Sequence, residues 1–163
     1  MKKQKNPNVL TLKESRAIIK SNLKQMKEWE KKKRRKVTPE EYTTVMKNPD
    51  NVLEIDQLET CFFTDNGVVR SVNNISLEVP KNSIVGLVGE SGCGKSVTSL
   101  SIMQLVQAPQ GQVVGGQIRF NSGELGTNEN GEALCYDVTK MPTLDMCRIR
   151  GKDISMKIGR AHV

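Results

Sequence analysis

Eight consecutive residues have the types and spacing that suit the binding of a polyphosphate: Gly89-Glu90-Ser91-Gly92-Cys93-Gly94-Lys95-Ser96. They fit the phosphate-loop pattern G-x-x-x-x-G-K-[ST] without a mismatch. Glycines let the main chain approach phosphate oxygens, so that backbone N–H groups hold most of the polyphosphate. The ammonium of Lys95 can reach the β- and γ-phosphates, and the hydroxyl of Ser96 suits Mg²⁺, which prefers oxygen ligands. Glu90 and Cys93 mainly lend their N–H groups.

Such a loop requires a strand before it and a helix after it. Residues 83–88 are a short, almost wholly apolar run, which predicts a parallel strand buried on both faces. Residues 97–106 carry a broad apolar face, which predicts a helix that ends at Ala108-Pro109-Gln110-Gly111. The alternative is a glycine-rich turn that binds nothing, but a turn does not require Gly94, Lys95 and Ser96 in that order.

The remaining elements are predicted from alternation of apolar and polar residues and from turn residues. Upstream of the loop we expect strands at 52–56, 68–72 and 75–79, at least partly antiparallel, with a turn at 64–67. Downstream we expect a strand at 115–120, a loop or insertion at 121–140, a short helix at 141–151 and the start of a strand at 153–156.

The first fifty residues differ from the rest in charge. Residues 1–36 hold fourteen Lys and Arg against three Glu, a net of +11, whereas the whole chain has +7. A capping box at Thr11–Glu14 opens a predicted helix of about four turns, and the basic block 31–36 is predicted to be frayed or disordered. A second capping box at Thr38–Glu41 predicts a short helix through about Met46, and 48–50 mark a domain boundary. A solvated extension is favoured for this basic part over a surface for anionic lipid or nucleic acid, because stacking aromatics are absent apart from Trp29.

Four cysteines lie far apart without a C-x-x-C pair, which favours neither a zinc site nor a disulfide framework. No apolar run approaches the length of about 18 residues that suggests a membrane span.

The order of these motifs resembles the ATP-binding subunit of an ABC transporter, in the oligopeptide, dipeptide and nickel importer group. The resemblance covers residues 52–156. One carrying segment runs from Gly86-Leu87-Val88 through the phosphate loop to Val97-Thr98. The others are Phe62-x-Thr64-x-x-Gly67, Val72-Asn73-Asn74-Ile75-Ser76-Leu77, Gly116-Gln117-Ile118-Arg119-Phe120 and Arg148-Ile149-Arg150-Gly151-Lys152-Asp153-Ile154-Ser155-Met156.

The resemblance implies an α/β fold of the P-loop NTPase, ABC ATPase type, of which only the N-terminal part is expected, with antiparallel strands preceding the phosphate loop. It implies ATP and Mg²⁺ as cofactors and transport-coupled ATP hydrolysis by the family. The implied partners are transmembrane permease subunits, a second ATPase subunit and, indirectly, an extracytoplasmic solute-binding protein, with no nucleic acid. The implied location is the cytoplasmic face of the membrane, as a peripheral protein. The implied phosphate-binding residues are Gly89, Glu90, Ser91, Gly92, Cys93, Gly94, Lys95, Ser96 and Val97. Ser96 is also the implied ligand of Mg²⁺. Phe62 is implied to stack on the adenine ring, with Phe63 as the alternative.

The sequence also departs from the family. Three elements of the family are not among the 163 residues: the signature Leu-Ser-Gly-Gly-Gln, the acidic strand with the catalytic glutamate, and the switch histidine. We therefore expect a fragment that does not hydrolyse ATP. Residues 158–163, Ile-Gly-Arg-Ala-His-Val, resemble the translation of a common sequencing-adapter oligonucleotide, with a genuine divergent C-terminus as the alternative. We therefore expect a basic extension at 1–50, a truncated ATPase domain at 51–157 and a non-native tail at 158–163. The alternatives are another P-loop NTPase, such as a kinase, and a basic-tailed module that binds nucleic acid or lipid.

Overall fold

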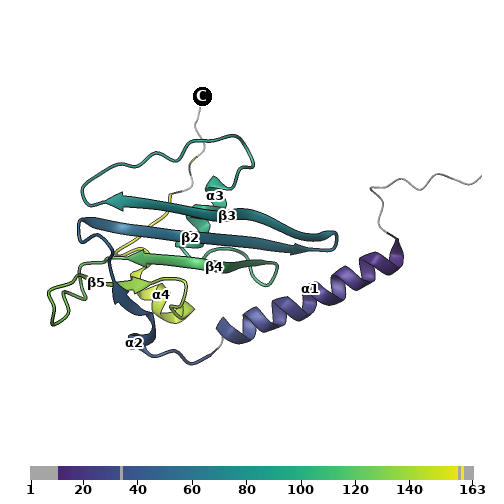
Figure 1. Cartoon of the computed structure of the whole chain (residues 1–163), viewed down its shortest axis with the longest axis horizontal. Helices are drawn as coiled ribbons and strands as arrows, with labels where there is room; N and C mark the ends of the chain where they lie inside the picture. The colour runs from purple at the N-terminus through teal and green to yellow at the C-terminus, as the bar shows by residue number, and fades with distance from the viewer. Residues whose placement is uncertain (1–10, 34, 158, 160–163) are drawn as a thin grey trace, which may run out of the picture.

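One five-stranded sheet organises the chain (Figure 1). The structure is a computed structural model that describes residues 11–33, 35–157 and 159. The strand order is β1-β5-β4-β2-β3, and every neighbouring pair is antiparallel. The strands are β1 (Thr43–Val45), β2 (Asn51–Thr64), β3 (Gly67–Pro80), β4 (Gly111–Phe120) and β5 (Leu134–Asp137).

The longest strands, β2 and β3, form a hairpin whose turn lies where the sequence predicted it. The Thr64 hydroxyl donates to the Gly67 carbonyl at 2.8 Å, and Gly67 has a φ of 134°, which favours glycine. The strand predicted at 52–56 continues to Thr64, and the two strands predicted at 68–72 and 75–79 are one continuous strand. Antiparallel pairing extends from the pair Thr64 and Gly67 to the pair Asn51 and Pro80, with interruptions where the register shifts, and satisfies backbone groups that separate short strands would have left open.

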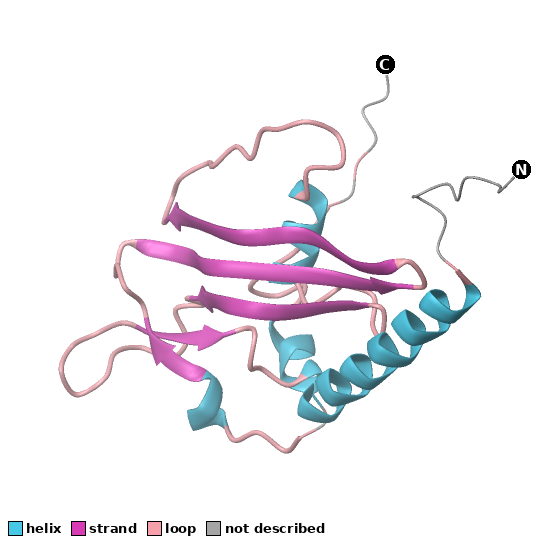
Figure 2. Ribbon diagram, turned by 45° about the vertical axis from the view of Figure 1, so that its right-hand side comes forward, coloured by secondary structure: helices cyan, strands magenta, loops and turns pink. Residues whose placement is uncertain are grey.

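Two short helices, α3 (Lys95–Ile102) and α4 (Thr143–Ile149), lie on the same face of the sheet (Figure 2). Between this face and the helices lies the core, in which Leu58, Ile118, Val138 and Met146 are completely buried. The phosphate loop is thus attached to a helix that packs on the sheet.

Several predicted boundaries in the second half were wrong. The helix predicted at 97–106 begins at Lys95 and ends at Ile102, and the stretch 121–140 contains the strand β5. Residues 153–156 form no strand in the described structure, because Ile154 makes only an isolated bridge to Arg150. The helix predicted at 141–151 is confirmed as α4.

The N-terminal part is more ordered than the sequence predicted. Helix α1 (Leu12–Lys33) has 22 residues and includes positions 31–33 of the basic block, which were predicted to be frayed. Its capping box is formed: the Thr11 amide donates to the Glu14 carboxylate at 2.7 Å. The second predicted helix is short, because α2 (Pro39–Tyr42) gives way to β1, which pairs with β5. None of the described helices is both long and apolar enough to cross a membrane.

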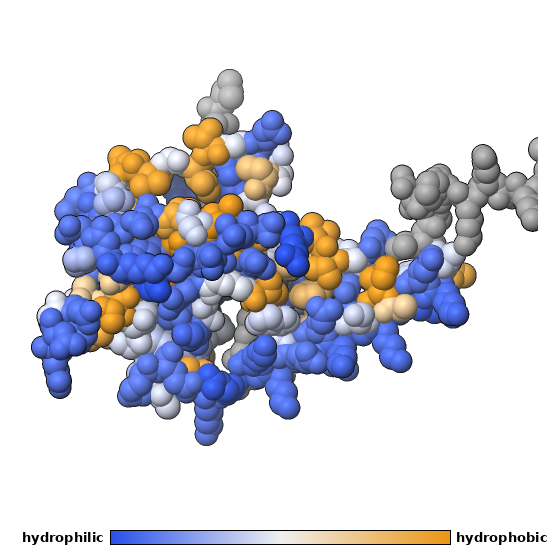
Figure 3. Space-filling view, in the orientation of Figure 1, coloured by the Kyte–Doolittle hydropathy of each residue, from blue (hydrophilic) through white to orange (hydrophobic). Residues whose placement is uncertain are grey.

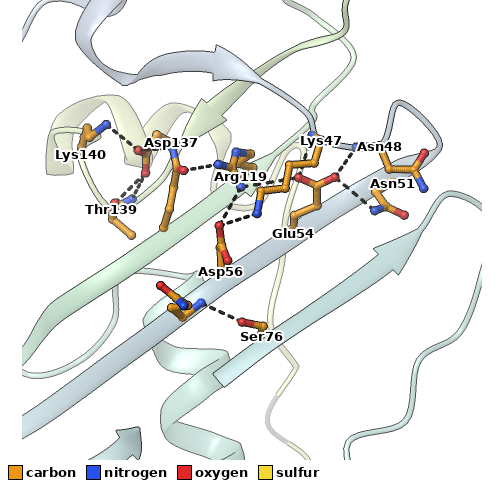
Figure 4. Close-up of polar contacts among 12 residues, drawn as sticks. Lys47, Asn48, Asn51, Glu54, Asp56, Ser76, Arg119, Asp137, Thr139 and Lys140 are labelled. Carbon is orange, nitrogen blue, oxygen red and sulfur yellow. Dashed lines mark hydrogen bonds and ion pairs between the residues drawn. The ribbon is translucent and has the colours of Figure 1, made fainter. Parts of the chain in front are cut away.

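A cluster of charged side chains connects the segment between β1 and β2 with β2 and β4 (Figure 4). Glu54, 2% exposed, accepts from the backbone amides of Lys47 and Asn48 at 3.0 and 2.8 Å and lies 3.8 Å from the Arg119 guanidinium. The hydrogen bond from the Lys47 ammonium lowers the pKa of Asp56, which also lies 3.7 Å from Arg119. The cluster therefore fixes the segment that leads into β2 against the middle of the sheet.

Candidate phosphate-binding site

The phosphate loop lies between the end of β3 and the first turn of α3 (Figure 1). Gly92 and Gly94 adopt φ angles of 84° and 96°, in the left-handed region that favours glycine. Gly94 also approaches the backbone of β3 closely, since a Cβ at this position would lie 2.2 Å from the Ser71 carbonyl oxygen. Glycine is required here both for the turn and for the contact between the loop and the sheet.

Lys95 folds over the loop that precedes it. Its ammonium donates to the carbonyl oxygens of Gly89 and Glu90, both at 2.6 Å, and lies 3.5 Å from the Cys93 sulfur. These contacts place the positive charge on the inner side of the loop, where a phosphate group would be held. The role of Lys95 in binding phosphate stays a prediction, with its ammonium positioned on the loop by these contacts.

The first turn of α3 supplies further donors. Gly94 caps the helix without a side-chain hydrogen bond, so the cap leaves the first-turn N–H groups open to an anion. Ser96 is exposed, and its hydroxyl makes no hydrogen bond to any part of the chain that the structure describes. Open amides, a lysine ammonium and a free hydroxyl are the donor and ligand types that a Mg²⁺-bound polyphosphate needs, so these residues fit it.

Buried hydroxyls hold α3 on the sheet. The hydroxyls of Ser101 and Thr60 share a hydrogen bond of 2.8 Å, and both residues are at most 1% exposed. Ser101 also donates to the Val97 carbonyl at 2.7 Å. A buried polar pair with its hydrogen bonds satisfied fixes the helix in one position on β2.

Arg150 caps the other end of α3, a role that sequence reasoning missed. Its Nε donates to the Met103 carbonyl at 2.8 Å and its terminal nitrogen to the Gln104 carbonyl at 2.9 Å. A guanidinium at a helix C-terminus satisfies open carbonyls and opposes the negative end of the helix dipole. The signal in the sequence was the segment from Arg148 to Met156, which indicated the family but not a contact.

We expect Arg150→Met to lower the free energy of unfolding by about 2 kcal/mol, because it removes two charge-assisted hydrogen bonds while keeping much of the side-chain volume. Urea unfolding followed by circular dichroism measures this change. The matched control is Arg148→Met: this side chain is 82% exposed and makes one ion pair to Asp145, so the loss should stay below about 1 kcal/mol. Equal losses in the two variants would contradict the capping role.

The strand predicted before the loop is not formed. Residues 83–88 pair with no strand in the described structure, and Ile84 and Val88 are 101% and 93% exposed. The apolar composition was identified correctly, but a strand exists only where a neighbour supplies hydrogen bonds. The loop is therefore positioned by Gly94 and α3 instead of by a strand.

Phe62 and Phe63 differ in burial. Phe63 is 5% exposed and belongs to the buried side of β2, as ordinary core packing predicts. Phe62 is half-buried, and its ring lies so close to Gly111 that a Cβ there would be 2.8 Å away. No contact described in the structure joins Phe62 to the phosphate loop, so its stacking on adenine stays a prediction.

The cysteines form no disulfide, since Cys61, Cys93, Cys135 and Cys147 are all free thiols. Burial raises the pKa of Cys135 to about 12, which keeps this thiol protonated and unreactive. Among the described residues, no group of His, Cys, Asp or Glu is arranged to hold a metal ion. Of the predicted C-terminal tail, only Gly159 lies within the described residues.

Comparison with known proteins decides the family. Residues 72–146, which include the whole loop and α3, match the family model described as "ABC transporter". This part of the chain belongs to the ABC transporter family. Its fold is accordingly that of the P-loop NTPases, with antiparallel strands before the loop, as the sequence predicted.

The ABC transporter relatives carry names from peptide transport. An oligopeptide transport ATP-binding protein, AppD of Bacillus subtilis, is 37% identical over 105 residues, which are 64% of this chain and 28% of the relative. A dipeptide transport ATP-binding protein of the same organism, DppD, is 36% identical over 107 residues, 66% of this chain and 28% of the relative. A probable D,D-dipeptide transport ATP-binding protein of Escherichia coli, DdpD, is 51% identical over 67 residues, 41% of this chain and 20% of the relative. The chain thus spans less than a third of the length of these relatives.

Proposed function

We propose that this chain carries the phosphate-binding part of an ATP-hydrolysing subunit that powers the import of peptides through an ABC transporter. The geometry of Lys95 over the glycine loop is the observation that carries the proposal. The names of the relatives support the peptide as the transported class.

Each part of the loop has a separate task in holding ATP. The backbone N–H groups of Gly89–Ser96 and Val97 would hold the phosphates, and the Lys95 ammonium would donate to phosphate oxygens in place of the Gly89 and Glu90 carbonyls. The Ser96 hydroxyl would hold Mg²⁺, which would supply positive charge to the phosphates. Phe62 stacks on the adenine ring in this proposal.

The same proposal places the protein peripherally at the cytoplasmic face of a membrane. Permease subunits and a second ATPase subunit are its direct partners, and a solute-binding protein acts through the permease. ATP hydrolysis belongs to the whole subunit. The expectation that these 163 residues alone do not hydrolyse ATP stays a prediction.

Lys95→Ala tests the nucleotide site. We expect the affinity for Mg²⁺-ATP to fall at least tenfold, because the variant removes charge-assisted hydrogen bonds to phosphate. Titration of the full chain with a fluorescent ATP analogue measures the change. The control is Lys157→Ala, an exposed lysine outside the loop, which should bind as the unaltered chain does. Unchanged binding by Lys95→Ala, or no binding by the unaltered chain, would overturn the proposal.

A further inference from the structure

Six exposed cations follow one line along helix α1. They occur at intervals of three or four residues, so the helical repeat brings them to one face. We call them the cationic stripe: Lys13, Arg16, Lys20, Lys24, Lys27 and Lys31. In the space-filling view, long hydrophilic side chains project from α1 away from the sheet (Figure 3).

The opposite face of α1 is occupied by the rest of the protein. Asn22 is 5% exposed and donates from its side-chain amide to the Thr64 carbonyl at 2.7 Å, at the turn of the β2–β3 hairpin. Ile18 and Met26, one turn before and after, are half-buried. In a helix, residues two positions apart point to opposite sides. Arg16, Lys20 and Lys24 each lie two positions from Ile18, Asn22 or Met26 and therefore point away from the sheet. The stripe therefore faces outward because the helix is docked.

The stripe is unfavourable for the helix on its own. Arg16, Lys20 and Lys24 are successive i,i+4 neighbours, and like charges at this spacing destabilise a helix. Within the described residues, no carboxylate lies at ion-pair distance from any cation of the stripe. An anionic surface would remove this repulsion.

Apolar side chains accompany the cations. On the surface of α1, the apolar side chains of Ile19 and Leu23 line an open depression together with Arg16, Lys20, Lys24 and Lys27. Leu23 is 48% exposed, and Leu12, further along the same edge, is 80% exposed. Long basic side chains beside exposed apolar ones suit a membrane surface, where the cations meet head groups and the apolar groups meet the acyl boundary.

We infer that helix α1 binds anionic phospholipid head groups through the cationic stripe. Nucleic acid fits less well, because the stripe has no aromatic side chain for stacking; Trp29 is half-buried and lies under the Lys32 ammonium, 4.4 Å from it. The choice of lipid over an acidic protein rests in part on the proposed function, which puts the subunit beside a membrane. Lipid binding itself needs no nucleotide.

The test compares two variants of the full chain that lose the same charge. The stripe variant is Lys20→Gln, Lys24→Gln and Lys27→Gln, since glutamine keeps the helix propensity of lysine. The control variant is Lys36→Gln, Arg148→Gln and Lys157→Gln, three exposed cations outside the stripe. Circular dichroism establishes that both remain folded.

Cosedimentation with phosphatidylcholine vesicles that contain phosphatidylserine gives the main result. We expect the unaltered chain and the control to bind at low salt and to be released as salt rises, with little binding to pure phosphatidylcholine. Each lysine is expected to raise the partition coefficient onto the vesicles about fivefold. The loss of three lysines therefore predicts that the stripe variant partitions about a hundredfold more weakly. ATP-analogue binding by the same variant should be unchanged, which separates this inference from the proposed function.

Three results would overturn the inference. The first is no binding to the anionic vesicles at low salt, and the second is equal binding by the stripe and control variants. The third is stripe-dependent binding to single-stranded RNA that is tighter than binding to the vesicles, which would assign the stripe to nucleic acid instead.

Discussion

Gly94→Ala is expected to displace the phosphate loop and to lower the free energy of unfolding by at least about 3 kcal/mol. A methyl group here would lie 2.2 Å from the Ser71 carbonyl oxygen, and the φ of 96° is itself strained for alanine. The loop must then move away from β3, which carries the start of α3 with it. Urea unfolding measures the loss of stability, and the fluorescent ATP analogue should no longer bind.

Gly92→Ala is the matched control for this change. Gly92 has a similar φ of 84°, but none of the described residues has an atom within 4 Å of a Cβ at that position. It therefore incurs the backbone strain without the collision, and we expect a loss of about 1 to 2 kcal/mol. Equal losses at the two glycines would show that the contact with Ser71 does not hold the loop.

Glu54→Ala is expected to lower the free energy of unfolding by about 3 to 5 kcal/mol, because it removes one partner of a buried ion pair. The backbone amides of Lys47 and Asn48 lose their acceptor, and Arg119 loses one of its two carboxylate neighbours. Urea unfolding again gives the value.

The control for this substitution lies directly opposite on β3. Glu78 pairs with Glu54 in the register of the hairpin, but it is exposed, and within the described part of the chain it accepts only from the side-chain amide of Asn51, at 2.9 Å. Glu78→Ala should cost less than about 1 kcal/mol. A loss at Glu54 no larger than at Glu78 would mean that the buried cluster does not hold β2 in place.

Features set by residues close together in the chain could be predicted. The capping box of Thr11 and Glu14 and the hairpin turn before Gly67 are both present, because each depends on contacts across three residues. The motif at Gly89–Ser96 is local in the same sense, because a phosphate-binding loop requires glycine, lysine and serine at fixed spacing. Its conformation follows from those residues.

Features that depend on distant partners could not be predicted. Residues 83–88 have the composition of a strand, but pairing is a property of the neighbour as much as of the segment. Conversely, β5 lies in the polar stretch 121–140, for which the composition predicted a loop. It is a strand because it pairs with both β1 and β4. The contacts of Arg150 with the end of α3 span more than forty residues, and no local pattern indicates them.

The segment that leads to the phosphate loop also affects how the protein behaves at high concentration. Ile84 and Val88 are fully or almost fully in water, in a run rich in β-branched and apolar residues without an acid or a base. Such a segment can pair with any extended chain that it meets, including its own counterpart in a second molecule. These residues therefore limit the resistance of the protein to aggregation, whereas the buried face of the sheet determines only the free energy of unfolding of each molecule.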